Sequence, residues 1–207
     1  MTEARSPTGR RRRKAHDRTY QITDPDQLRA LVSTVRADIM DQVAAFGPLS
    51  VREIGQLTGA APSSLYHHIQ RLAEVGLLVE AGMRPSGRKP EQLYDTPAPR
   101  MRMLEALQAA VNQPVLDALV ESMCKQAARD FARGVAAPHR LTGGATRNVR
   151  FARLVCRPDA DTLRQINAHL DAVTELIARS ADGEGERIAY AWVVTPQDPK
   201  RGRSRPD

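Results

Sequence analysis

Two short helices joined by a tight turn are the feature of this sequence that most restricts its fold. Ser50 and Glu53 have the Ser-x-x-Glu spacing of a capping box, in which each side chain accepts a hydrogen bond from a free backbone N–H at a helix start. Residues 58–61 (TGAA) predict a turn, and Pro62 suits the first turn of the next helix. Helices this short are unstable alone, so they must pack against a neighbour.

A longer helix upstream is the predicted packing partner. Asp24 is a good N-cap, and Pro25 is tolerated at the first helical position. Residues 47–48 (Gly-Pro) predict its end. Between these limits, apolar residues recur every three or four positions and predict one face of a single helix: Leu28, Val32, Val35, Ile39, Val43 and Phe46.

The second short helix is followed by a basic hairpin. Strands are predicted at 77–80 and 92–96, and Gly76 ends the helix before them. Residues 82–90, GMRPSGRKP, contain three basic residues and no acidic one. The order is therefore helix, short helix, turn, short helix and basic hairpin, which is rarer than any of its parts.

Residues 28–96 resemble the winged helix-turn-helix of ArsR-type bacterial transcriptional repressors. The stretches that carry the resemblance are GPLSVREIGQLTG, SSLYHHIQRLAEVGLL, and the GRKP of the hairpin with Tyr94 after it. The resemblance implies a homodimer, a DNA operator and control by a small signal. The chain's C-terminal part looks like the extension of larger relatives.

The helix predicted over 62–75 has the two faces that a recognition helix needs. Leu65, Ile69 and Leu72 predict a buried face, which leaves a polar face for the major groove. Glutamine can pair with adenine, whereas an arginine late in the helix is better placed for a phosphate. With the hairpin tip, the predicted DNA contacts are Ser63, Ser64, Tyr66, His67, Gln70, Arg71, Arg84, Arg88 and Lys89. His68 is predicted to be partly buried and is not among them.

The excess of basic residues lies in the two ends of the chain. The net charge is +7, of which residues 1–20 contribute +5 and residues 196–207 contribute +2. Both segments lack Leu, Ile, Val and Phe, so we expect disordered basic tails. The run Arg10–Lys14 is expected either to add salt-sensitive affinity for phosphates or only to increase solubility.

The C-terminal half is predicted to contain helices and a β-α-β unit. Helical periodicity covers 100–112 and 114–136, with Pro114 separating or kinking them. Residues 138–146 read as a linker. Strands are predicted at 149–156 and 187–195, with a helix between them that begins at Pro158-Asp159. Its apolar stripe, Leu163, Ile166, Leu170, Val173 and Ile177, is expected to pack on the strands or to seal a dimer.

The predicted fold class is therefore α+β and mainly α. The expected domain limits are a basic tail at 1–20, a winged helix-turn-helix at 21–97, a helical linker or dimerisation region at 98–137, the β-α-β region at 138–195 and a tail at 196–207. No run of residues is long and apolar enough for a transmembrane helix.

Two other functions are alternatives. The first is a metal- or thiol-responsive sensor. The metal sensors of the family that this sequence resembles often carry two cysteines one residue apart on the helix before the recognition helix, where this chain has Ser50 and Arg52. Cys124 and Cys156 have no ligand spacing with His139 or His169. An enzyme or interaction module on the β-α-β unit remains an alternative, but the sequence has no phosphate loop, nucleophile elbow or paired carboxylates.

The sequence thus predicts a cytoplasmic bacterial transcription regulator. The expected protein is a homodimeric repressor of a near-palindromic operator in double-stranded DNA, released by a small effector. It is expected to be no enzyme and to need no cofactor, no metal and no membrane.

Overall fold

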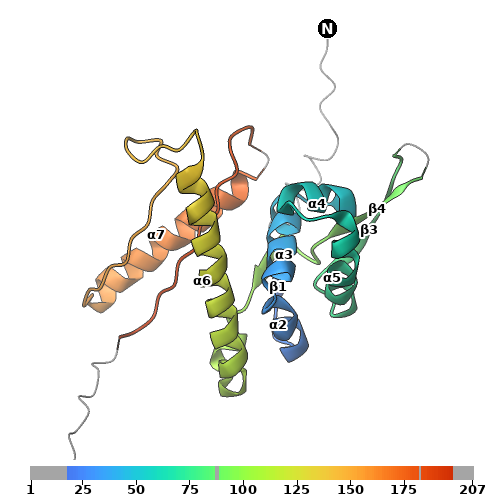
Figure 1. Ribbon diagram of the computed structural model, residues 1–207. Helices are drawn as coiled ribbons and strands as arrows, with labels where there is room; N and C mark the ends of the chain where they lie inside the picture. Colours follow the sequence, from blue (N-terminus) through green and yellow to red (C-terminus); the bar gives the residue numbers. More distant parts are fainter. Residues whose placement is uncertain (1–17, 87–88, 182, 198–207) are drawn as a thin grey trace, which may run out of the picture.

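The computed structural model describes residues 18–86, 89–181 and 183–197 (Figure 1). These residues form a mixed structure of helices and two small sheets. The predicted class of mixed α and β structure, mainly α, is confirmed at this level. The predicted contacts at Arg88, the run Arg10–Lys14 and most of both tails lie outside the described residues.

The helix predicted over residues 25–46 is two helices, so the single-helix prediction is wrong. α2 spans Pro25–Leu31 and α3 spans Thr34–Phe46, with Ser33 in an extended conformation as the N-cap of α3. Serine favours such a position, and the Arg36 Nε donates a 2.5 Å hydrogen bond to the Ala30 carbonyl at the end of α2. The break changes the helical register, so Val35 is exposed.

The two short helices form as predicted. α4 spans Val51–Thr58 and α5 spans Pro62–Glu74. The Glu53 N–H donates to the Ser50 Oγ at 3.3 Å, and the Ser50 N–H donates to the Glu53 carboxylate at 2.9 Å. Gly59 ends α4 at φ +74°, a left-handed conformation that favours glycine.

A three-stranded antiparallel sheet contains the predicted hairpin. β3 (Val79–Arg84) pairs with β4 (Glu91–Asp95), and β4 also pairs with β2 (Leu49–Ser50), which directly precedes α4. The register of β3 shifts between Glu80 and Met83, and β3 extends further towards the loop than predicted.

A second sheet pairs a strand that precedes α2 with a strand that follows β4. β1 (Thr19–Gln21) pairs in parallel with β5 (Arg100–Arg102), so the predicted disordered tail at 1–20 is wrong for its last two residues. The prediction of a helix at 100–112 is also wrong. This segment begins with β5 and continues with short 3₁₀ turns at Ala106–Gln108 and Ala110–Asn112. Pairing with β1 overrides the local helical periodicity of this segment.

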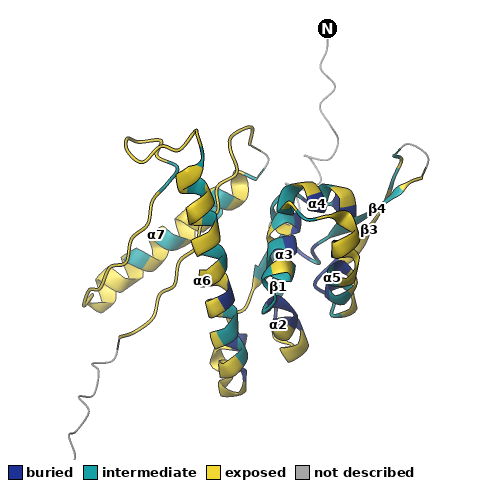
Figure 2. Cartoon of the chain, in the orientation of Figure 1, coloured by how far each residue is buried: buried dark blue, intermediate teal, exposed yellow. Residues whose placement is uncertain are grey.

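The hydrophobic core lies among α2, α3, α4 and α5. Every buried residue of the described chain falls between Ile22 and Ser122, as the dark blue segments in Figure 2 show. The largest fully buried apolar side chains are Leu28, Ile39, Val43, Ile54, Leu65, Leu72, Leu77 and Leu78.

The C-terminal half has two long helices and no strand in its described part. α6 spans Gln113–Ala136 with Pro114 in its first turn, and α7 spans Ala160–Arg179 with Asp159 as its N-cap. The β-α-β prediction is therefore wrong for its two strands, because residues 149–156 and 187–195 form no ladder. Alternating side chains alone do not make a strand, which needs a neighbour for its N–H and carbonyl groups.

Hydrogen bonds connect this half to the core region. The Arg100 guanidinium donates to the Glu175 carboxylate of α7 at 2.6 Å. The Arg187 guanidinium donates to the Gln42 side chain of α3 at 3.1 Å and to the Leu57 carbonyl in the last turn of α4 at 3.0 Å.

Candidate nucleic-acid interface

The outer face of α5 presents a row of polar side chains to solvent. Leu65, Ile69 and Leu72 are at most 2% exposed and fix the orientation of the helix. The side chains on the other face are exposed, and they are the predicted contacts Ser63, Ser64, Tyr66, His67 and Gln70. The sequence periodicity therefore identified both faces of this helix.

Some of these side chains already have partners on α5. The Ser64 hydroxyl donates to the Ala61 carbonyl at 2.7 Å, at the start of the helix. Glu74 accepts from the Gln70 amide at 3.1 Å and pairs with Arg71 at 3.4 Å. Exposed pairs such as these are weak, so the Gln70 and Arg71 side chains can exchange them for other partners.

Positive charge gathers beside the second half of α5. The pKa of Arg36 on α3 is lowered by burial and by the charge of Arg71. The pKa of His68 is lowered by burial, by Arg36 and by its neighbour His67. Arg36 and Arg71 thus contribute positive charge from two different helices, and each also has a partner within the fold, Arg36 the Ala30 carbonyl and Arg71 the Glu74 carboxylate.

Arg36 was missed by the sequence prediction. It stands in the first predicted helix, none of whose residues was among the predicted DNA contacts, and it lies near the start of α3, just after the break at Ser33. His68 is half-buried as predicted, and its Nδ1 is buried without a hydrogen-bond partner among the described residues.

Arg84 does not lie at the hairpin tip, so this part of the prediction is wrong. It is the last residue of β3, and its guanidinium pairs with the Glu53 carboxylate at 2.6 Å and with the Glu91 carboxylate at 3.6 Å. The register shift in β3 brings Arg84 opposite Glu91, which sequence position alone could not show. Lys89, by contrast, is exposed in the loop as predicted.

Four charged residues connect the hairpin to α4. Arg52 donates to Glu91 at 2.8 Å, and Arg84 bridges Glu91 and Glu53. The hydrogen bond from Arg52 is the main reason that the pKa of Glu91 falls to about 2. Burial raises the pKa of Glu53, but the hydrogen bonds from the Ser50 backbone and from Arg84 lower it by more. The pKa of Glu53 therefore lies below its ordinary value. The network holds the hairpin in place beside the two short helices.

The two cysteines lie on separate segments of the C-terminal half. Cys124 on α6 and Cys156 are both exposed and free. The His139 Nε2 lies 3.5 Å from the Glu186 carboxylate. Within residues 18–86, 89–181 and 183–197, no three His, Cys, Asp or Glu side chains form a group that could hold a metal ion.

None of the described helices is both long and apolar enough to cross a membrane. Comparison with protein-family models finds no family that matches this chain, and no curated protein matches it either.

Proposed function

We propose that residues 19–96 form a winged helix-turn-helix that binds double-stranded DNA and that the protein regulates transcription. The observation that carries the proposal is the polar outer face of α5, whose inner face is fixed in the core by three fully buried side chains. α4, the turn at Gly59, α5 and the hairpin follow one another in the order found in a winged helix-turn-helix. The arrangement corresponds to the ArsR-type resemblance of the sequence.

In this proposal the side chains of α5 divide into two groups. Ser63, Ser64, Tyr66, His67 and Gln70 face the base edges of the major groove, where glutamine can pair with adenine. Arg71 and Arg36 contact phosphates, which position the protein without reading sequence.

The hairpin contributes in two different ways. Lys89, which is exposed, contacts the DNA backbone, and Arg88 is proposed to do the same from its sequence position next to Lys89. Arg84 acts indirectly, because its ion pairs with Glu53 and Glu91 position the hairpin relative to α4.

The protein is proposed to act as a homodimeric repressor. Two copies related by a twofold axis would place their α5 helices in successive major grooves, roughly 34–36 Å apart, on a near-palindromic operator. Exposed apolar side chains along α6, among them Val120, Met123 and Val135, support α6 as part of the dimer contact.

The experiment begins with selection of genomic fragments by the purified full chain. Affinity for the selected site and for point-substituted sites is then measured by fluorescence anisotropy at several salt concentrations. Gln70→Ala should reduce the preference for the selected site more than it reduces non-specific affinity. Gln108→Ala changes an exposed glutamine away from α5 and is the matched control.

Arg88→Ala should weaken binding to all sequences and reduce the salt slope by about one. Unchanged specificity in Gln70→Ala, together with unchanged affinity in Arg88→Ala, would contradict the proposed docking of α5 and the hairpin.

A further inference from the structure

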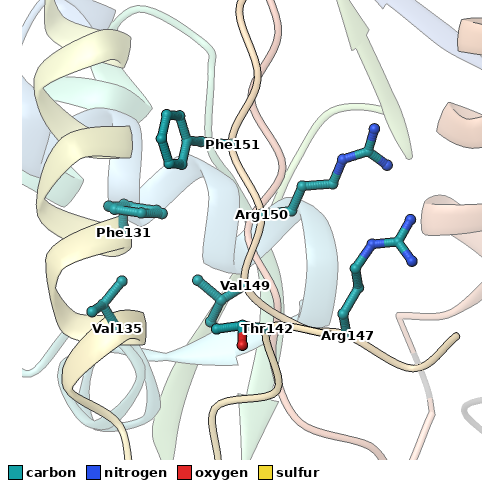
Figure 3. Close-up of a pocket in the computed structure, with 7 residues that line it drawn as sticks. All are labelled: Phe131, Val135, Thr142, Arg147, Val149, Arg150 and Phe151. Atoms are coloured by element: carbon teal, nitrogen blue, oxygen red, sulfur yellow. The ribbon is translucent and has the colours of Figure 1, made fainter. Parts of the chain in front are cut away.

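A cavity of about 370 Å³ lies between the second half of α6 and the segment that follows it. One side is apolar and is formed by Phe131 and Val135 of α6 with Val149 and Phe151. The rings of Phe131 and Phe151 meet edge to face, with centroids 5.3 Å apart, and they lie next to each other in Figure 3. Phe131 is 39% exposed and Phe151 is 82% exposed, so much of this aromatic surface is open to a ligand.

Arg147 and Arg150 also line the cavity, and their guanidinium groups point away from the two phenyl rings. Figure 3 shows the guanidinium groups of Arg147 and Arg150 extending from the opposite side of the segment that carries Phe151. Arg147 donates to the Gly144 carbonyl at 2.9 Å, whereas Arg150 has no ion pair or hydrogen bond within the described residues. No acidic residue lines the cavity. Exposed side chains change rotamer rapidly, so both guanidinium groups can turn to the cavity mouth.

We propose that this cavity binds a small organic anion with an aromatic or bulky aliphatic body, such as an arenecarboxylate. Its volume is within the range of small-molecule sites. The body of the ligand would cover the exposed phenyl rings, and its carboxylate would accept charge-assisted hydrogen bonds from the arginines. A neutral aromatic molecule would bury the same apolar area but would form no charge-assisted hydrogen bond with the arginines.

The test is calorimetric titration of the full-length protein with naphthalene-2-carboxylate and with its neutral analogue naphthalene-2-carboxamide. The carboxylate should bind once per chain and about tenfold more tightly than the carboxamide, since a charged hydrogen bond is lost with the amide. Absence of carboxylate binding, or equal affinity for the two compounds, would overturn the proposal.

Variants locate the binding site. Arg150→Gln should bring the carboxylate affinity down to that of the carboxamide, and Phe151→Ser should weaken both compounds. Arg157→Gln removes an exposed arginine of the same segment that does not line the cavity, and it should bind like the wild type. Equal losses in Arg150→Gln and Arg157→Gln would indicate a general charge effect and refute the site. The titrations contain no DNA, so their failure would leave the DNA-binding proposal intact.

Discussion

Helices α5 and α7 have the same kind of sequence pattern and opposite surroundings. Both carry apolar residues every three or four positions, yet α5 buries Leu65, Ile69 and Leu72, whereas α7 buries no residue at all. The apolar pattern identifies the face of a helix that could be covered. Whether something covers that face depends on elements elsewhere in the chain or in a partner.

The difference extends to the two regions that contain these helices. Residues 19–122 hold all the buried side chains of the described chain, while residues 123–197 hold none. The first region is therefore stabilised by apolar packing, and the second is joined to it by side-chain links such as Arg100–Glu175. Regions with few buried contacts open most easily.

The largest expected difference between the two regions is in the loss of unfolding free energy when one leucine side chain is removed from each. Leu72→Ala should reduce the free energy of unfolding by about 2–5 kcal/mol, because it leaves a cavity in the core. Leu170→Ala, on the half-buried stripe of α7, should cost less than about 1 kcal/mol. Urea unfolding followed by circular dichroism measures both, and equal losses would mean that α7 is covered in solution.

A smaller loss is expected when a methyl group is added inside the first region. In Gly55→Ala the new Cβ would lie 2.8 Å from the Ala60 carbonyl oxygen and 3.3 Å from the Pro62 ring, so the turn between α4 and α5 must shift. The expected cost is about 1–3 kcal/mol of unfolding free energy. Gly143→Ala, where no atom lies within 4 Å of the added Cβ, is the control in the second region. Similar melting temperatures for the two variants would disprove this difference in packing.

The ion pairs between the hairpin and α4 should make stability depend on pH. Arg52 holds the pKa of folded Glu91 at about 2, below the ordinary value of 4.5. The charged carboxylate therefore contributes fully above about pH 4.5, and its contribution is lost as the pH falls towards 2. The difference in melting temperature between wild type and Glu91→Gln should shrink over this interval. Glu105→Gln is the control for loss of an exposed carboxylate, and a constant difference down to pH 2 would argue against the pairing.

The smallest effect is expected at the link between the regions. Arg187→Gln removes a guanidinium that donates to the Leu57 carbonyl, and as an exposed contact it should cost less than about 1 kcal/mol. Amide hydrogen exchange in the turn after α4, residues 58–61, should nevertheless become faster. Arg179→Gln removes an arginine bonded within its own helix and should leave the exchange of this turn unchanged. If Arg187→Gln also left the hydrogen exchange of residues 58–61 unchanged, the hydrogen bond from Arg187 to the Leu57 carbonyl would have no influence on the end of α4.

Local signals explain which parts of the structure were predictable. α4, α5 and the hairpin were found from the capping box, Gly59 and helical periodicity, each of which acts within a few residues. The break at Ser33 was missed because the apolar periodicity continues across it, although Ser33, Ala30 and Arg36 are close in sequence. The pairing of β1 with β5 was missed because the two strands are far apart in the sequence.

The candidate DNA interface likewise contains residues that local sequence signals predicted and residues that they did not. The exposed face of α5 was predicted from its period, and its polar side chains are exposed as expected. Arg84 was misplaced because the strand register decides its partners, and Arg36 was missed because only the folded structure brings it near Arg71.

The pairing of β1 with β5 affects the order in which the chain can assemble. Thr19 lies opposite Arg100, which comes 81 positions later. On a ribosome, β1 emerges early but has no partner until the whole α2–β4 segment has been made. We therefore expect the helices and the hairpin to pack first, through contacts that are close in sequence, and the first strand of the described chain to be the last to pair.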